Sequence, residues 1–228
     1  MKSQYEFNLQ FQDDRDYYLK HLDFLNWYRY YFIIREIIDF KPKQILEIGV
    51  GSGLVKNCLQ PIVEEYTVMD VNKKLEPDIL ADVREKKKEL EQRFDCVIVA
   101  DVLEHIPFDD VAMSLCNVYS YLKDGGKALI TIPHRRSHFL IMTPTYKLNV
   151  ITVPTGFLSP GAFYRRFIKR KIWIDPSHLW EIGDGKIKRA DVELSYKKVG
   201  FSLEKFHKLL YVDFWVLKKI KACESLFA

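Results

Sequence analysis

The sequence has few of the features that mark membrane or exported proteins. No apolar run approaches the about 20 residues that a membrane span needs, and the mean hydropathy is −0.16. The four cysteines stand far apart and include no Cys-x-x-Cys pair, so the pattern indicates neither a disulfide framework nor a zinc site. The first ten residues lack a basic-then-apolar leader pattern. We therefore expect a reduced, cytoplasmic protein.

Acidic residues are missing from one long segment. Residues 135–171 contain eight Lys and Arg side chains and no Asp or Glu. The whole chain carries a net charge of +4, so the remaining residues together carry −4. The basic character therefore belongs to this segment, and any attraction to an anionic partner is predicted to arise there.

The hydrophobic pattern predicts one α/β domain. With 228 residues and 48% hydrophobic content, the chain can bury a substantial core. Strand-length apolar runs alternate with helical stretches in the middle of the chain, which predicts a doubly wound, mostly parallel sheet. The predicted organisation is N-terminal helices at 1–42, a core at 43–133, an insertion at 134–180, and a last helix and hairpin at 181–228.

Two helical predictions lie outside this alternation. Residues 13–40 repeat aromatic side chains at spacings of three and four, which is typical of amphipathic helices, and Pro42 ends the pattern. Residues 86–93 are highly charged, and we expect them to form a solvated helical stretch.

The most informative motif is residues 45–53, which read Ile-Leu-Glu-Ile-Gly-Val-Gly-Ser-Gly. A short apolar strand runs into glycines that permit a sharp turn and the close approach of a ligand. A helical stretch follows, so its first backbone N–H groups point at the turn. Strand, turn and helix together predict a nucleotide-type cofactor site. The acid just before the turn, Glu47, would repel a pyrophosphate and would suit a cationic amine.

This motif resembles the first motif of the class I S-adenosylmethionine-dependent methyltransferases. The resemblance implies a Rossmann-like fold with a seven-stranded sheet, an antiparallel C-terminal hairpin and a cap insertion after the fifth strand. It also implies S-adenosylmethionine as cofactor and S-adenosylhomocysteine as product, with the glycine turn against the methionine moiety. The cofactor-binding residues of this part would be Glu47, Gly49, Val50, Gly51 and Gly53.

Two later acids fit the same cofactor by resemblance. Asp70 and Val71 end the second strand about 20 residues beyond the glycine turn, where a carboxylate can accept hydrogen bonds from both ribose hydroxyls. Asp82 follows the third strand and would face the adenine amino group, with the Val83 amide at a ring nitrogen. The alternatives are a strand-end cap for Asp70 and a plain turn residue for Asp82.

Residues 100–107 read Ala-Asp-Val-Leu-Glu-His-Ile-Pro, which resembles the fourth-strand segment of the family's small-molecule branch, including quinone-biosynthesis enzymes. Asp101 and Val102 would line the cofactor pocket. His105 is the catalytic candidate, because an imidazole there could remove a proton near neutral pH. The alternative is that His105 only shapes the pocket.

Two more histidines are predicted at the same rim. His134 directly follows the fifth strand, and His178 lies in a Pro-Ser-His-Leu-Trp stretch that ends at Trp180. We expect all three of these residues near the acceptor. Three imidazoles could hold a metal, but the histidine spacing matches no metal motif, so the sequence predicts no metal site.

The insertion at 134–180 bears on which acceptor the protein uses. Ser159 and Pro160 form a good helix start. The stretch that follows has an apolar and a basic face, so we expect a basic amphipathic helix within a cap over the acceptor. Three interpretations stay open: a lid with a solvated basic face, a site for a phosphate-bearing substrate, and a contact with an anionic membrane. The basic residues of this helix are Arg165, Arg166, Lys169 and Arg170.

The predicted function is transfer of a methyl group to a small-molecule acceptor, anionic or lipid-linked, by in-line displacement. Such a reaction needs alignment and desolvation more than a nucleophilic triad. A base-flipping Asn/Asp-Pro-Pro-Tyr motif and a Pro-Cys motif are absent, which disfavours nucleic acid as acceptor. RNA or protein methylation and an inactive cofactor-binding scaffold remain the alternatives, and the acceptor atom stays open between O, N and C.

Overall fold

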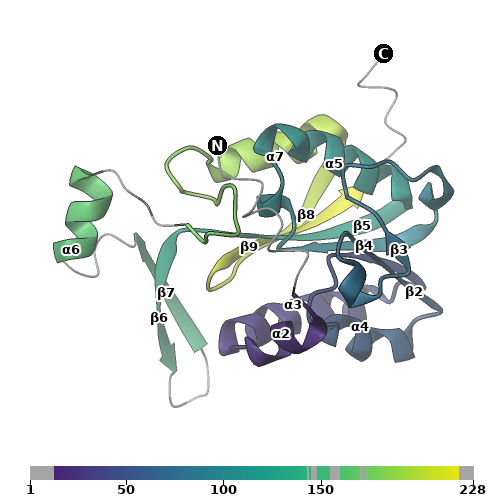
Figure 1. Ribbon diagram of the computed structural model, residues 1–228, viewed down its shortest axis with the longest axis horizontal. Helices are drawn as coiled ribbons and strands as arrows, with labels where there is room; N and C mark the ends of the chain where they lie inside the picture. Colours follow the sequence, from purple (N-terminus) through teal and green to yellow (C-terminus); the bar gives the residue numbers. More distant parts are fainter. Residues whose placement is uncertain are drawn as a thin grey trace.

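The computed structural model describes residues 13–142, 144, 148–154, 160–169, 172 and 174–220. Its main sheet has seven strands in the order β3-β2-β1-β4-β5-β9-β8 (Figure 1). The first five strands run parallel, and β9 runs antiparallel to both β5 and β8. The predicted seven-stranded, mostly parallel sheet with an antiparallel C-terminal hairpin is therefore confirmed. The strands are β1 Gln44–Ile48, β2 Glu65–Asp70, β3 Ile79–Leu80, β4 Phe94–Ala100, β5 Leu122–Pro133, β8 Phe201–Lys208 and β9 Val212–Lys219.

Helices cover both faces of the sheet, with α5 and α7 on one face and α3 and α4 on the other (Figure 1). Each face has its own buried cluster: Leu46 of β1 belongs to the α5 and α7 side, and its neighbour Ile45 belongs to the α3 and α4 side. This explains the nearly continuous apolar run of β1, since a strand covered on both faces has no solvent side. The helices are α2 Arg15–Lys20, α3 Phe24–Phe40, α4 Leu54–Leu59, α5 Phe108–Tyr121 and α7 Arg189–Val199, with single 3₁₀ turns η2 Gln60–Ile62, η3 Lys73–Leu75, η4 Lys88–Leu90 and η5 Leu103–His105.

The strand order reverses between β1 and β4, which are neighbours in the sheet. At this point the loops that leave the two strands separate, and ligands of open α/β sheets bind in the resulting crevice. Gly49 leaves β1 with φ +84°, and a Cβ on it would overlap Cγ2 of Val102, which follows β4. The two loops therefore interlock at the switch point, and only glycine fits on the β1 side.

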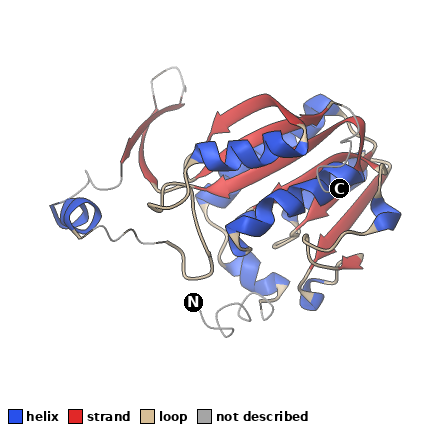
Figure 2. Ribbon diagram, turned by 90° about the horizontal axis from the view of Figure 1, so that it is seen from above, coloured by secondary structure: helices blue, strands red, loops and turns tan. Residues whose placement is uncertain are grey.

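The insertion after β5 forms an arm, which we define as residues 136–142, 148–154 and 160–169. Strands β6 Arg136–Met142 and β7 Leu148–Pro154 pair with each other in a separate two-stranded sheet. The short helix α6 Pro160–Phe163 and the π-helical turn η7 Tyr164–Ile168 follow. Figures 1 and 2 show the arm standing away from the main sheet. We expected a cap closed over the acceptor side, and the structure shows an extended arm in its place.

The predicted helix at 86–93 is wrong. This segment contains only the 3₁₀ turn η4, within irregular backbone. The Tyr121 hydroxyl explains the loop, because it accepts from the Lys87 amide at 3.0 Å and donates to the Glu85 carbonyl at 3.2 Å. Leu90 is buried beneath the turn.

In the described part of the chain, no helix is both long and apolar enough to cross a membrane.

Replacing Gly49 by Ala tests the interlock of the two loops. We expect Gly49→Ala to lower the free energy of unfolding by about 2–4 kcal/mol, from left-handed backbone strain plus overlap with Val102. Gly125→Ala is the matched control, because Gly125 has φ +77° and nothing within 4 Å of an added Cβ. The control should cost only about 1–2 kcal/mol. Equal losses for both variants in urea unfolding would contradict a close contact at the switch point.

Candidate active site at the carboxyl edge of the sheet

Asp70 joins the end of β2 to the glycine turn. Its carboxylate accepts from the Val50 amide at 2.9 Å and from the Asn72 amide at 2.8 Å. Burial raises its pKa, and backbone hydrogen bonds from Asn72, Val50 and Val71 oppose that rise. Asp70 thus serves as a strand-end cap. An ionised carboxylate has about four acceptor positions, and backbone amides use three of them. One position remains for a further donor, so a hydrogen bond from a ribose hydroxyl stays compatible with the cap.

Glu47 lies beneath the turn rather than on its surface. The side chain is buried, and the Tyr66 hydroxyl donates to its Oε2 at 2.9 Å. Burial raises the pKa of Glu47 to about 8. The carboxyl group is therefore mainly protonated at neutral pH, and a nearby cation would favour its ionised form. This environment is consistent with the predicted preference for a cationic amine over a pyrophosphate.

The N-terminal helices cover the glycine turn. Ring atoms of Tyr18 in α2 lie 3.7 Å from the Cβ position of Gly51, and the Tyr30 hydroxyl of α3 is 3.2 Å from Ser52 Oγ. Asn72 Nδ2 donates to the carbonyl of Asp13, just before α2, at 2.7 Å. The sequence predicted these helices but gave no sign that they lie over the turn, since the amphipathic pattern does not identify the packing partner.

Asp101 is held by partners from three other elements. It pairs with Arg29 of α3, accepts from the Thr131 hydroxyl at 2.6 Å, and lies 3.4 Å from the Tyr211 hydroxyl. Its φ is +53°, an uncommon conformation for a non-glycine residue. Arg29 was not among the predicted site residues. Its sequence signal is a basic residue on the buried stripe of α3, with Tyr30 and Ile33.

Asp82 is already engaged by a neighbour. Arg84 donates from Nε to Oδ1 at 3.0 Å and from Nη2 to Oδ2 at 2.6 Å. Burial alone would raise the pKa of Asp82, but the hydrogen bonds and charge of Arg84 outweigh it and hold the pKa below the ordinary value. The Val83 carbonyl accepts from Asn117 Nδ2 at 2.9 Å. An adenine contact at Asp82 therefore stays a prediction, and Arg84 would share the carboxylate with it.

The structure brings His105 and His178 together. Their rings meet edge to face, with centroids 4.9 Å apart. His105 Nδ1 is 3.1 Å from the Ser177 carbonyl. Because a carbonyl oxygen can only accept, Nδ1 carries the proton in this hydrogen bond, and Nε2 is the nitrogen with the lone pair. That tautomer has the form that a general base requires.

Glu104 completes this cluster. One ligand atom from each of Glu104, His105 and His178 lies within 4.8 Å of the others. Glu104 is fully buried, and among the described residues neither carboxylate oxygen has a hydrogen-bond partner, with His178 Nε2 at 4.0 Å from Oε1. Burial raises its pKa to about 8. A carboxylate with two imidazoles is a donor set that suits Zn²⁺ or another divalent cation. The sequence prediction of no metal site weighed only the three histidines and did not include Glu104.

Two residues expected at the acceptor rim are in the protein interior. The His134 side chain is fully buried, with Nε2 3.2 Å from the Leu209 carbonyl, and burial lowers its pKa to about 4. Trp180 is also buried and donates from Nε1 to the Ile106 carbonyl at 2.9 Å. These side chains support the loops around the site. The expectation failed for His134 because the β8–β9 turn, which carries Leu209, covers the end of β5.

The basic helix residues are not brought to the cluster. Arg165 is exposed on η7, within the arm that stands away from the sheet (Figure 1). The side chain of Arg166 lies outside the described residues, as does the whole of Arg170. Arg135 is different, because it pairs with the fully buried Glu181. Glu181 also accepts from His178 Nδ1 at 2.7 Å, so one charged network links the base of the arm to the histidine cluster.

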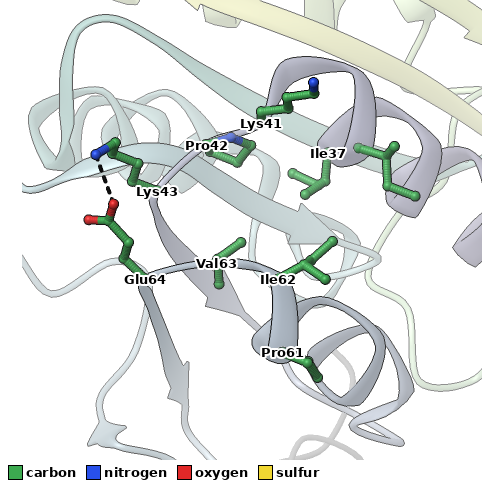
Figure 3. A pocket seen from close by; sticks show the side chains of 9 residues that line it. Ile37, Lys41, Pro42, Lys43, Pro61, Ile62, Val63 and Glu64 are labelled. Atoms are coloured by element: carbon green, nitrogen blue, oxygen red, sulfur yellow. Dashed lines mark ion pairs between the residues drawn. The ribbon is translucent and has the colours of Figure 1, made fainter.

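A pocket of about 570 Å³ lies at the opposite edge of the sheet. It is lined by apolar residues of α3 and η2, such as Ile37 and Ile62, and the Lys43–Glu64 ion pair at 2.8 Å stands at its side (Figure 3). None of the predicted site residues lines it. Its position before β1 places it away from the carboxyl ends of the strands, where the chemistry-bearing side chains gather.

Comparison with known proteins was consistent with this geometry. A family model described as "Methyltransferase domain" matches residues 25–167. The ubiquinone biosynthesis O-methyltransferase of Proteus mirabilis is 26% identical, over 60% of this chain and 61% of that protein. The chain thus matches about three fifths of that relative's length.

Solved structures share the fold. The N-methyltransferase NodS of Bradyrhizobium japonicum, in complex with S-adenosylhomocysteine, aligns with a TM-score of 0.64 at 13% identity, over 97% of this chain and 100% of that one. The 1,6-didemethyltoxoflavin-N1-methyltransferase of Burkholderia thailandensis aligns with a TM-score of 0.54 at 13% identity, over 85% of this chain and 77% of that one. At such identities the likeness shows the fold alone.

The raised pKa of Glu104 predicts a pH-dependent stability. Between the unfolded value of 4.5 and the folded value of about 8, the folded protein holds a proton that the unfolded chain has lost, so stability falls as pH rises. With a chelator present, Glu104→Gln should unfold near the wild-type temperature at pH 5 and about 4 °C or more above it at pH 8. The exposed Glu89→Gln is the control.

The same thermal experiment reports on a cation. A divalent ion favours the ionised carboxylate, so added Zn²⁺ should raise the unfolding temperature of the wild type and not that of Glu104→Gln. If Glu104→Gln is no more stable than the wild type at pH 8 with a chelator present, the claim that Glu104 is buried in its protonated form is contradicted.

Proposed function

This chain belongs to the methyltransferase domain family whose model it matches, and from that membership we propose that it is an S-adenosylmethionine-dependent methyltransferase of a small-molecule acceptor. One observation carries the proposal. The Val50 amide of the glycine turn donates a hydrogen bond to Asp70, at the point where the strand order reverses. This is where open α/β sheets bind nucleotide-type ligands.

The residues present fit the proposed cofactor. The glycine turn would lie against the methionine part, with Glu47 beneath it as a counter-charge that ionises when a cation approaches. Asp70 would accept from the ribose hydroxyls, and Asp82 with Val83 would meet the adenine. Asp101 and Val102 would border the reacting group from the β4 side. The remaining members of the proposed set are Gly49, Val50, Gly51, Gly53 and Val71.

The cofactor supplies an activated methyl group, and the protein aligns an acceptor with it and excludes water. A hydroxyl acceptor also needs a proton acceptor. His105 fits this task because the Ser177 carbonyl fixes the proton on Nδ1 and leaves the lone pair on Nε2. His178 and Glu104 beside it would set the orientation and local charge of the imidazole.

The acceptor class is inferred from the named relatives and from the charge of residues 135–171. The named relative is an O-methyltransferase of ubiquinone biosynthesis, which favours a hydroxyl acceptor, whereas the two structural neighbours are N-methyltransferases. The acid-free basic stretch at 135–171 supports an acceptor that is anionic or lipid-linked. RNA or protein as acceptor, or an inactive scaffold, are the alternatives that a cofactor-binding measurement paired with an acceptor screen would separate.

Cofactor binding is the first test. S-adenosylhomocysteine should bind at micromolar level in calorimetry, and Asp70→Ala should lose about 1.5–3 kcal/mol through lost charge-assisted hydrogen bonds. Asp78→Ala is a matched control, because the Asp78 carboxylate likewise accepts a backbone amide, that of Val68, at 2.7 Å. Unchanged affinity in Asp70→Ala would remove the ribose role. Tighter binding of NAD than of S-adenosylhomocysteine would refute the methyltransferase proposal.

His105 is tested by turnover. His105→Ala should lower the rate of methyl transfer by about 10²–10⁴-fold, with cofactor affinity nearly unchanged. The wild-type rate of methyl transfer should rise with pH as the imidazole loses its proton. The exposed His21→Ala is the control variant. If the His105 variant keeps most of its turnover, the residue has a packing role only.

A further inference from the structure

The hairpin of the arm exposes apolar side chains on one face. Phe139 and Ile151 stand directly opposite each other in the β6–β7 register, so their side chains share a face of the two-stranded sheet. Ile141 follows on the same face, two residues along β6. These three side chains are 50%, 50% and 48% exposed. These side chains are exposed because the hairpin stands away from the main sheet (Figure 2).

The helical part of the arm has a second exposed apolar surface. Phe163 and Phe167 contact each other with ring centroids 4.8 Å apart. Together with Tyr164 and Ile168 they form a cluster in which each side chain is between 42% and 64% exposed. Exposed apolar patches of this kind are rare on soluble proteins unless they meet a partner or a membrane.

Basic residues flank both apolar surfaces. Arg136 begins the hairpin, and Arg165 and Lys169 lie between and beyond the apolar residues of η7; all three are exposed. The sequence offers no acid anywhere in 135–171 to neutralise them from within. Some exposed cations elsewhere pair with acids, as in the Lys43–Glu64 ion pair. The arm combines exposed apolar surface with positive charge that no acid within 135–171 offsets.

We propose that the arm is a docking surface for an anionic lipid bilayer. Its aromatic and aliphatic side chains enter the boundary between headgroups and acyl chains, and its basic side chains meet lipid phosphates. A nucleic acid would also attract the charges and could stack on the phenylalanines. The isoleucines Ile141, Ile151 and Ile168 gain nothing from phosphates or bases, but they do gain from burial among acyl chains, which favours the bilayer.

The arm is attached to the body next to the candidate active site, so docking would place that site at the bilayer. This step rests on the proposed function. The arm leaves the body at the end of β5, where the Arg135 amide donates to the Ile182 carbonyl at 2.9 Å. It returns beside His178, and Arg135 pairs with the buried Glu181 that holds this histidine. Beyond the arm, the Asp175 amide donates to the same Glu181 at 2.9 Å, so the chain segments before and after the arm both contact the residue that holds His178. Docking would hold that site at the bilayer surface, within reach of a lipid-soluble acceptor.

Vesicle binding tests the proposal without needing the acceptor. Vesicles of phosphatidylcholine alone and of phosphatidylcholine with 30% phosphatidylglycerol (roughly the anionic share at which charge attraction is strong) are sedimented with the full chain. We expect partition into the anionic vesicles only, weakened by salt because exposed charges are screened. The arm variants are Phe163→Ser/Phe167→Ser, Ile141→Ser/Ile151→Ser and Arg165→Glu/Lys169→Glu.

Matched controls lie on and beside helix α7, away from the arm (Figure 1). Lys197→Glu/Lys198→Glu changes the same charge at exposed positions, and Leu194→Ser/Leu203→Ser removes apolar side chains that are 51% and 44% exposed. Each arm variant should lower the partition coefficient by roughly tenfold or more, whereas both controls should leave it within about twofold of the wild type. Thermal unfolding checks that every variant is folded.

Three outcomes would overturn the proposal. The wild type fails to bind anionic vesicles, the folded arm variants bind as well as the wild type, or size-exclusion chromatography shows a dimer that only the arm variants break while vesicles are ignored. Binding of S-adenosylhomocysteine is measured in parallel and should be unchanged in the arm variants. A wild-type protein that binds S-adenosylhomocysteine but not anionic vesicles refutes docking alone, and one that binds the vesicles but not S-adenosylhomocysteine refutes the proposed function alone.

Discussion

The close packing of Val102 on Gly49 holds the two central loops of this protein together. It occurs where the strand order reverses, between the loop that leaves β1 and the loop that leaves β4. The loop after β1 is tied to β2 through Asp70, and the loop after β4 continues into Glu104 and His105. A Cβ at position 49 would push these loops apart. The proposed cofactor residues and the candidate base lie on these two loops, which approach each other closely where position 49 has no side chain.

Buried charge is the second constraint on this edge of the sheet. Glu47 and Glu104 are buried with pKa values raised to about 8, and Asp101 is compensated by Arg29 from the N-terminal helix. Buried acids without a cation cost stability, and a bound positive charge relieves that cost. Acids whose pKa values are strongly shifted are common at functional sites. It also explains why α3 carries an arginine on its buried stripe.

The insertion after β5 follows a different physical logic. In the core, apolar strands are covered on both faces, whereas the hairpin β6–β7 leaves Phe139 and Ile151 half exposed. Basic residues accompany that surface without acids. The segment before the arm is tied to the body through the Arg135–Glu181 ion pair. Under our docking proposal the surface of the arm meets a bilayer, and this ion pair links that contact to the histidine cluster.

The sequence by itself determined the alternating core, the glycine turn and the acids that follow each strand, because strand burial and backbone turns leave local patterns of period and residue type. It placed His105 and His178 at one rim, but it did not identify the other distant side chains that meet. Arg29 reaches Asp101, and Glu104 lies beside His178, only through packing of separate segments. Local pattern also misjudged His134, which the β8–β9 turn buries. Tertiary structure decided these positions, because burial and pairing depend on which element covers a residue, and no local spacing records that.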